Sequence, residues 1–219
     1  MEASFRLIFS SSIMLRITLI LCGITALLIS PLQGADTGRL VIVGGALSDR
    51  EESIFEALLA GSVPRHELQA AVIAAASSRP AHYGEQFRQQ LIARGLDAAK
   101  VRLLPLAVVD DENTPEVDES DWAGNGNAPE IVSWIEACDL VWFTGGDQSR
   151  ITAVLRPDEE DSKVLKALRD LLQRGGTIGG TSAGAAMMSE RMIVGGSSRG
   201  ALFEGVATAD AVDQEGGPL

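Results

Sequence analysis

The stretch GGTIGGTSAGAAMMSE, residues 175–190, is the most informative part of the sequence. In it a single serine lies between a short apolar run, which predicts a strand, and an alanine-rich segment, which predicts a helix. Residues Gly180 to Gly184 satisfy the pattern G-x-S-x-G around Ser182. The pattern lies between a predicted strand and a predicted helix, the context in which it forms a sharp turn that presents a serine hydroxyl. Glycines beside the serine permit the strained backbone angles and the close strand approach that such a turn requires.

Two interpretations of Ser182 stay open at this point. Serine is a favoured helix N-cap, so the side chain can simply cap the helix that follows. Alternatively Ser182 is a nucleophile at a helix N-terminus, where free N–H groups stabilise a developing negative charge. In that case the backbone N–H of Ala183 is a natural oxyanion donor.

Outward from this stretch, apolar runs alternate with helical patterns over most of the chain. Strands are predicted at 39–47, 70–77, 100–110, 139–147 and 176–180, and helices at 53–61, 84–95, 129–138, 148–156, 162–175 and 184–192. Residues 111–129 form a long acidic loop that suits a mobile segment or one that hangs over a site. Continuous apolar strands separated by helices predict a doubly wound α/β domain, with a mostly parallel sheet covered on both faces.

A second glycine-rich loop, FTGGDQSR at residues 143–150, follows another predicted strand. Function in doubly wound domains gathers outside the carboxyl ends of the strands, so this loop and the Ser182 turn are expected at one site. Gly145 and Gly146 are placed to supply a second oxyanion donor, since a side chain there would keep the backbone away from a substrate carbonyl. The alternative is an ordinary strand-to-helix turn. Neither glycine run matches a phosphate-binding or dinucleotide-binding motif.

Composition and charge limit the classes of protein. The 219 residues, 46% hydrophobic and 22% charged, suit one globular domain. Residues 1–35 have the layout of a secretory signal, with an uncleaved membrane anchor as the alternative, so we expect a single domain over 36–219 and a secreted or periplasmic location. Removing residues 1–35 leaves 16 basic and 29 acidic residues, a net charge of −13. Such a surface disfavours nucleic acid and anionic membranes as partners.

The two cysteines predict no disulfide. Cys22 lies within the signal segment and leaves Cys138 alone in the mature chain. Cys138 ends an apolar helical pattern and is interpreted as a small buried hydrophobic residue.

Three stretches together resemble one known family. RLVIVGGAL from Arg39, FTGGDQSRI from Phe143 and GTSAGAAMMSERMI from Gly180 resemble the cyanophycinases, serine exopeptidases related to dipeptidase E, over a span from about Arg39 to Ile193. The resemblance implies a flavodoxin-like or class I glutamine amidotransferase-like fold without metal or organic cofactor. It also implies hydrolysis of the β-linked aspartyl-arginine polymer cyanophycin to dipeptides, and an assembly that can be a homodimer.

The same resemblance implies a role for individual residues. Ser182 is the expected nucleophile, and the amides of Gly146 and Ala183 are the expected oxyanion hole. Gln148 is expected to contact the peptide substrate, and Asp147 to brace its loop.

The chain departs from the family pattern in its histidines. A serine nucleophile needs a base, which the family supplies as a histidine after the serine, whereas His66 and His82 both precede Ser182. His82 follows a predicted strand and faces either the edge of the site or the solvent. We therefore expect a C-terminally incomplete chain whose base lies beyond Leu219.

Three hypotheses for function result. The first is a serine exopeptidase that cleaves β-aspartyl-arginine peptides through an acyl-enzyme on Ser182. The second is a non-catalytic fragment or binding protein of the same fold. The third is a serine esterase of the α/β-hydrolase type, which shares G-x-S-x-G but needs an oxyanion loop that this chain lacks before the turn.

Overall fold

A computed structural model of the protein describes residues 38–45, 47–61, 63–189, 192–193 and 202–203. The predicted signal segment, residues 1–35, lies outside these ranges, as do residues 204–219. In the described part of the chain no helix is both long enough and apolar enough to cross a membrane.

In the described residues, five parallel strands form one sheet in the order β1-β5-β4-β2-β3. The strands are β1 (Arg39–Val43), β2 (Ala70–Ile73), β3 (Val101–Leu104), β4 (Leu140–Phe143) and β5 (Thr177–Thr181). From the adjacent strands β2 and β4 the chain continues in opposite directions, to β3 on one side and to β5 on the other. The crevice between two such strands, outside their carboxyl ends, is where ligands bind in open α/β sheets.

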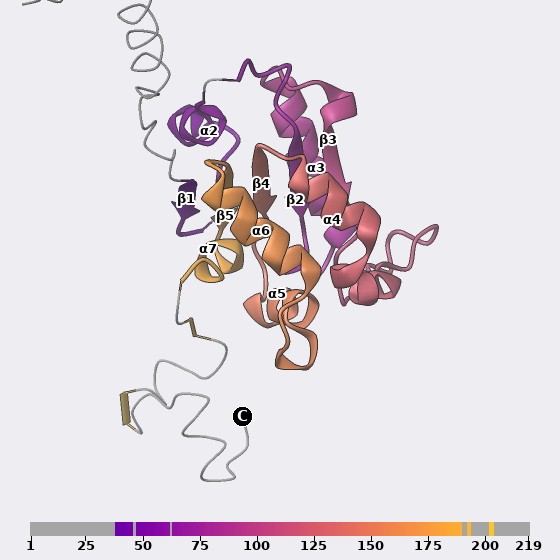
Figure 1. The fold of residues 1–219 in the computed structure, drawn as a ribbon. Coiled ribbons are helices and arrows are strands. Elements are labelled where there is room, and N and C mark those ends of the chain that lie inside the picture. The colour runs from indigo at the N-terminus through magenta and orange to yellow at the C-terminus, as the bar shows by residue number, and fades with distance from the viewer. Residues whose placement is uncertain (1–37, 46, 62, 190–191, 194–201, 204–219) are drawn as a thin grey trace, which may run out of the picture. The chain divides into compact units, whose positions relative to one another are not determined.

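Helices cover both faces of the sheet, as predicted. On one face α2 (Glu52–Leu59) and α3 (Pro80–Ala93) pack against Val72 and Trp142. On the other face α4 (Pro129–Glu136), α5 (Gln148–Leu155) and α6 (Lys163–Gln173) pack against Ile73 and Phe143, and Figure 1 shows α4 and α6 lying side by side. Successive strand residues enter opposite cores because side chains alternate across a pleated strand. The doubly wound α/β prediction is confirmed.

Most predicted elements have somewhat different bounds in the structure, and three of these differences reflect local backbone geometry. The strand expected over 100–110 ends at Leu104, because Pro105 has no N–H for the ladder and the Leu106 N–H turns back to the carbonyl oxygen of Leu104 at 2.8 Å. Helix α3 begins at Pro80 rather than Gly84, since proline suits the first helical position. The helix expected over 184–192 is shorter in the structure, where α7 spans Ala183–Ala186. After α7 the described chain makes backbone hydrogen bonds between residues three apart, as in a 3₁₀ helix.

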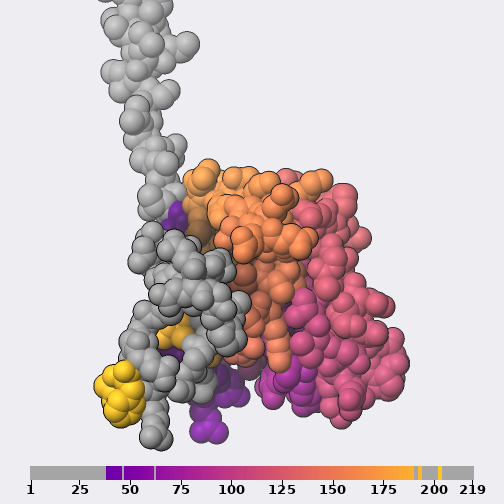
Figure 2. Space-filling model, turned by 90° about the horizontal axis from the view of Figure 1, so that it is seen from below, coloured from indigo at the N-terminus to yellow at the C-terminus, as the bar shows by residue number. Residues whose placement is uncertain are grey.

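The acidic segment 111–129 differs from the predicted mobile or overhanging loop. It contains the 3₁₀ helix η2 (Glu119–Asn127), and both Asp111 and Glu119 are buried. Figure 2, viewed from below Figure 1, shows the pink surface of this region beside the orange surface of the following helices, and η2 contacts both α5 and α6. Two shorter 3₁₀ helices, η1 (Ala98–Lys100) and η3 (Pro157–Glu159), complete the described elements.

Cys138 is buried at the end of α4 among apolar side chains. Burial raises the pKa of its thiol to about 12, because the thiolate would lose its hydration. The interpretation of Cys138 as a small hydrophobic residue is confirmed.

Candidate active site

Ser182 occupies a strained turn between β5 and α7. Its φ is 54° and its ψ is −116°, angles that residues other than glycine rarely adopt and that cluster at functional sites. The residue is exposed, and its side chain makes no capping hydrogen bond to α7. The N-cap interpretation of the hydroxyl therefore finds no support in the geometry.

Glycines around the turn permit the close packing that the motif requires. A Cβ on Gly180 would lie 2.5 Å from the carbonyl oxygen of Gly184. A Cβ on Gly184 would in turn lie 2.5 Å from the carbonyl oxygen of Phe143 at the end of β4. Both separations are far below normal contact, so any side chain at either position would push α7 away from the strands.

The loop after β4 lies directly beside the Ser182 turn. A Cβ on Gly145 would lie 3.1 Å from the Cβ of Ser182. Gly146 has a φ of 145°, and a Cβ there would lie 2.0 Å from the carbonyl oxygen of Ala76 after β2. The two glycine-rich loops singled out in the sequence are thus brought together.

Two backbone amides near Ser182 have the properties of candidate anion donors. Ala183 is the first residue of α7, where an N–H has no acceptor within the helix. The N–H groups of Gly146 and Ala183 make no hydrogen bond to another described residue. Both amides therefore remain available to a ligand oxygen.

A pocket of about 430 Å³ opens beside Ser182 at the carboxyl ends of the strands. Four residues of α3 with helical spacing, Tyr83, Gln86, Phe87 and Gln90, form one wall. The ring of Trp142 stacks on that of Phe87 with the centroids 4.4 Å apart. The remaining lining comes from loops and strand ends, namely Leu47, Ser77, Ser78, Thr144, Gly145, Gly146, Thr181 and Ser182.

The described lining of this pocket combines apolar side chains with neutral polar ones and carries no ionisable group other than the phenol of Tyr83. The hydroxyl oxygens of Thr144 and Thr181 are buried and have no hydrogen-bond partner among the described residues. Such groups carry a desolvation cost that a bound polar ligand or water can relieve.

Asp147 and Gln148 follow Gly146 at the start of α5. The Asp147 carboxylate caps this helix by accepting from the Ser149 N–H at 2.9 Å and from the Ser149 hydroxyl at 2.6 Å. These hydrogen bonds lower the pKa of Asp147 and fix the start of α5. The role of Asp147 in bracing the whole loop stays a prediction. Gln148 does not line the pocket; its side-chain amide donates to the carbonyl oxygen of Ile193, and its contact with substrate stays a prediction.

Neither histidine lines the pocket. His66 is largely exposed and lies 3.5 Å from the carboxylate of Glu67. His82 is exposed on α3, where its ring meets the edge of the Tyr83 ring at a centroid distance of 4.9 Å. His82 thus lies one residue from the pocket wall without reaching it, and the described lining contains neither a histidine nor a carboxylate.

The pocket wall on α3 was not identified from the sequence. Tyr83, Gln86, Phe87 and Gln90 recur with the spacing of a single helix face, which also describes a helix that packs on a core. The position of α3 above the Ser182 turn depends on the strand order, and helical spacing carries no information about that order.

Curated proteins similar in sequence are cyanophycinases. The chain is 32% identical to the cyanophycinase of Nostoc sp. over 168 residues, which are 76% of this chain and 49% of that protein. It is 39% identical to the cyanophycinase of Geminocystis herdmanii over 74 residues, or 33% of this chain and 26% of that protein. The chain therefore spans half or less of the length of these relatives. No protein-family model matches it.

Two solved structures share the fold. A peptidase from an acI-B1 Actinobacterium superposes with a TM-score of 0.52 at 23% identity, covering 73% of this chain and 60% of its own. A protein assigned as peptidase E from Listeria monocytogenes superposes with a TM-score of 0.50 at 17% identity, covering 76% and 67%. The expected flavodoxin-like architecture is confirmed. In sequence the chain is thus similar to cyanophycinases, the resemblance that its glycine-rich loops predict, and it shares its fold with these two solved structures.

Proposed function

We propose that this protein is a serine-type peptidase that hydrolyses β-aspartyl-arginine peptides through an acyl-enzyme on Ser182. One observation carries the proposal: the exposed Ser182 lies on a strained turn, at a pocket beside two backbone amides that have no acceptor among the described residues. Strain of this kind is retained where it orients a reacting group. Similarity to cyanophycinases supports the choice of substrate class.

In the proposed reaction the Ser182 hydroxyl oxygen attacks the substrate carbonyl carbon and passes its proton to a base. The carbonyl oxygen becomes an oxyanion, which the N–H groups of Gly146 and Ala183 stabilise. The amine leaves with the proton, and water then hydrolyses the resulting ester. The described pocket lining contains neither a histidine nor a carboxylate. We therefore assign the base to residues outside that lining.

The lack of a histidine or carboxylate in the described lining also favours a second candidate function, a binding protein that holds the same peptides without cleaving them. Without a base, serine attack is slowed by orders of magnitude. The two candidates differ in turnover and share the same pocket.

Hydrolysis of β-aspartyl-arginine peptides, followed by release of the dipeptide in mass spectrometry, tests the proposal. Cleavage that is lost in Ser182→Ala and retained in Ser53→Ala, a change at an exposed serine of α2, supports the peptidase. Equal cleavage by Ser182→Ala would refute the assigned nucleophile. Calorimetric binding of the dipeptide without any turnover would favour the binding protein instead.

A further inference from the structure

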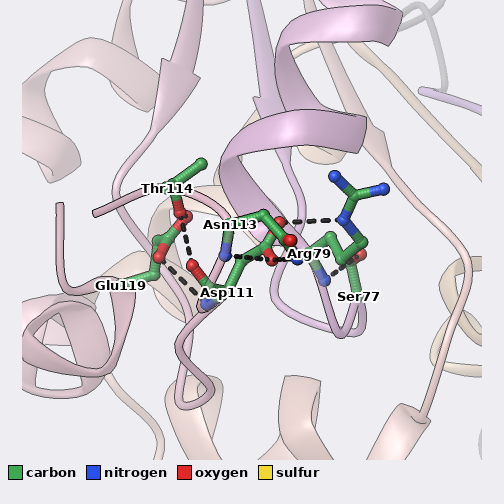
Figure 3. A network of polar contacts seen from close by, with 6 residues as sticks. All are labelled: Ser77, Arg79, Asp111, Asn113, Thr114 and Glu119. Atoms are coloured by element: carbon green, nitrogen blue, oxygen red, sulfur yellow. Dashed lines mark hydrogen bonds and ion pairs between the residues drawn. The ribbon is translucent and has the colours of Figure 1, made fainter. Parts of the chain in front are cut away.

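We propose that Arg79 is a positioning residue, which couples a buried carboxylate network to the backbone loop that carries the Gly146 amide. Figure 3 shows the network, in which Arg79 lies between Ser77 on one side and Asp111 on the other. The role assigned to the Gly146 amide rests on the proposed function, whereas the structural coupling does not.

The acidic segment folds around its own carboxylates. One Asp111 oxygen accepts from the Asn113 backbone N–H at 3.0 Å and from the Asn113 side-chain amide at 2.7 Å. Glu119 accepts from the Asp111 N–H at 3.2 Å and from the Thr114 hydroxyl at 2.9 Å. Two carboxylates that are buried side by side cost free energy unless they are hydrogen-bonded in this way.

Arg79 connects this segment to the start of α3. Its Nε donates to the second Asp111 oxygen at 2.9 Å, and the Asp111 side chain is only 2% exposed. Hydrogen bonds from Asn113, with a further contribution from Arg79, lower the pKa of Asp111, and the bond to Asp111 raises that of Arg79, so the pair is ionised near neutral pH. Arg79 is also the N-cap residue of α3 and makes no side-chain capping bond. Its guanidinium bonds the acidic segment and also lies over the ring of Tyr83 on α3, with Cζ 5.9 Å from the ring centroid.

The turn after β2 transmits this contact toward the site. The Arg79 backbone N–H donates to the Ser77 hydroxyl oxygen at 2.9 Å, and the Ser77 N–H donates to the Ala74 carbonyl oxygen at 2.9 Å. Ser77 also lines the pocket. The turn from Ala74 to Arg79 is therefore fixed at both of its ends.

The loop after β4 rests on this turn. The Asp147 N–H donates to the Ala76 carbonyl oxygen at 2.9 Å, and Gly146 approaches the same oxygen so closely that a Cβ would lie 2.0 Å from it. The preceding Gly145 approaches Ser182. A contiguous series of contacts thus runs from the carboxylate of Asp111 to the backbone beside Ser182.

Hydrogen exchange of the Asp147 amide tests the coupling, because that N–H is protected by the bond to Ala76. In the full chain, Arg79→Gln is expected to speed exchange at Asp147 about tenfold or more by local opening, with amides of α6 unchanged. Arg79→Lys, which keeps the positive charge beside Asp111, should give intermediate exchange. Arg65→Gln is the matched control, since the Arg65 side chain is 39% exposed against 38% for Arg79 and also forms an ion pair with a carboxylate.

Asp111→Asn provides a second variant that removes the same ion pair from the other side and is expected to give the same local change. Unchanged exchange at Asp147 in both variants would overturn the proposal, and so would equally faster exchange throughout α6, which indicates global destabilisation. If the protein cleaves its peptide, Arg79→Gln should lower kcat with little change in KM, because an oxyanion donor acts in the transition state. Absence of cleavage by the unaltered chain would bear on the proposed function alone and leave the exchange test intact.

Discussion

The backbone N–H of Ser182 donates to the carbonyl oxygen of Val43, 2.9 Å away at the end of β1. This bond continues the pairing of β1 with β5 by one residue beyond Thr181 and fixes the strained residue to the sheet. It also engages the amide of Ser182 itself, so the available donors beside the hydroxyl belong to the next residue, Ala183, and to the neighbouring loop.

Glycine at position 182 should stabilise the protein. A residue with a Cβ at this backbone conformation costs about 1–3 kcal/mol, a cost that glycine does not bear. Ser182→Gly is expected to raise the free energy of unfolding by about 1 kcal/mol or more over Ser182→Ala, although both changes remove the hydroxyl. Urea denaturation of the two variants measures the difference, and equal midpoints would show that the turn is unstrained.

Alanine at position 146 should disrupt the candidate site. The added methyl group would meet the Ala76 carbonyl oxygen, and the positive φ adds about 1–3 kcal/mol of strain, so the loop has to move. We expect Gly146→Ala to reduce peptide turnover by about 100-fold or more, as loss of an oxyanion donor does. Gly124→Ala is the control, because a Cβ at Gly124 meets nothing within 4 Å. Similar kinetics in the two variants would contradict the assigned donor.

The cap of α5 should contribute to stability through its hydrogen bonds. Asp147→Ala removes the acceptor for the Ser149 N–H and is expected to cost about 0.5–2 kcal/mol, whereas Asp147→Asn retains an acceptor and should cost less. Because the pKa of Asp147 is lowered in the folded state, this carboxylate stabilises the fold above its unfolded pKa and ceases to do so as pH falls through the folded one. The unaltered protein should therefore be more stable than Asp147→Ala at neutral pH, and the difference in their free energies of unfolding should shrink at acidic pH. Unfolding curves of both proteins at the two pH values measure this difference.

The thiol of Cys138 should be inert in the folded protein. With a pKa of about 12 it carries almost no thiolate at neutral pH, and its burial blocks access. In a Cys22→Ser background, a thiol reagent is expected to label Cys138 only after denaturant is added. The unfolded thiol ionises at lower pH than the folded one, so stability should also decline between about pH 9 and pH 12. Rapid labelling without denaturant would show that α4 opens readily.

Much of the fold and part of the site could be predicted from the sequence. Apolar runs alternating with helical patterns predicted the strands, and the rule on carboxyl ends placed the Gly145–Gly146 loop beside Ser182. The pocket wall of Tyr83 and Phe87 could not be predicted, because it depends on strand order. Nor could the burial of Asp111 and Glu119, since acidic residues in a polar segment are normally solvated. Their desolvation is compensated by hydrogen bonds from Asn113, Thr114 and Arg79, which depend on how the segment folds.

The stack of Trp142 on Phe87 gives the protein an intrinsic optical reporter. The indole ring lines the pocket and is only 1% exposed, so its emission should be blue-shifted and should respond when a peptide enters. Occupancy of the site can then be titrated by fluorescence in the unlabelled protein, with Trp142→Phe identifying the share of the signal from the other two tryptophans.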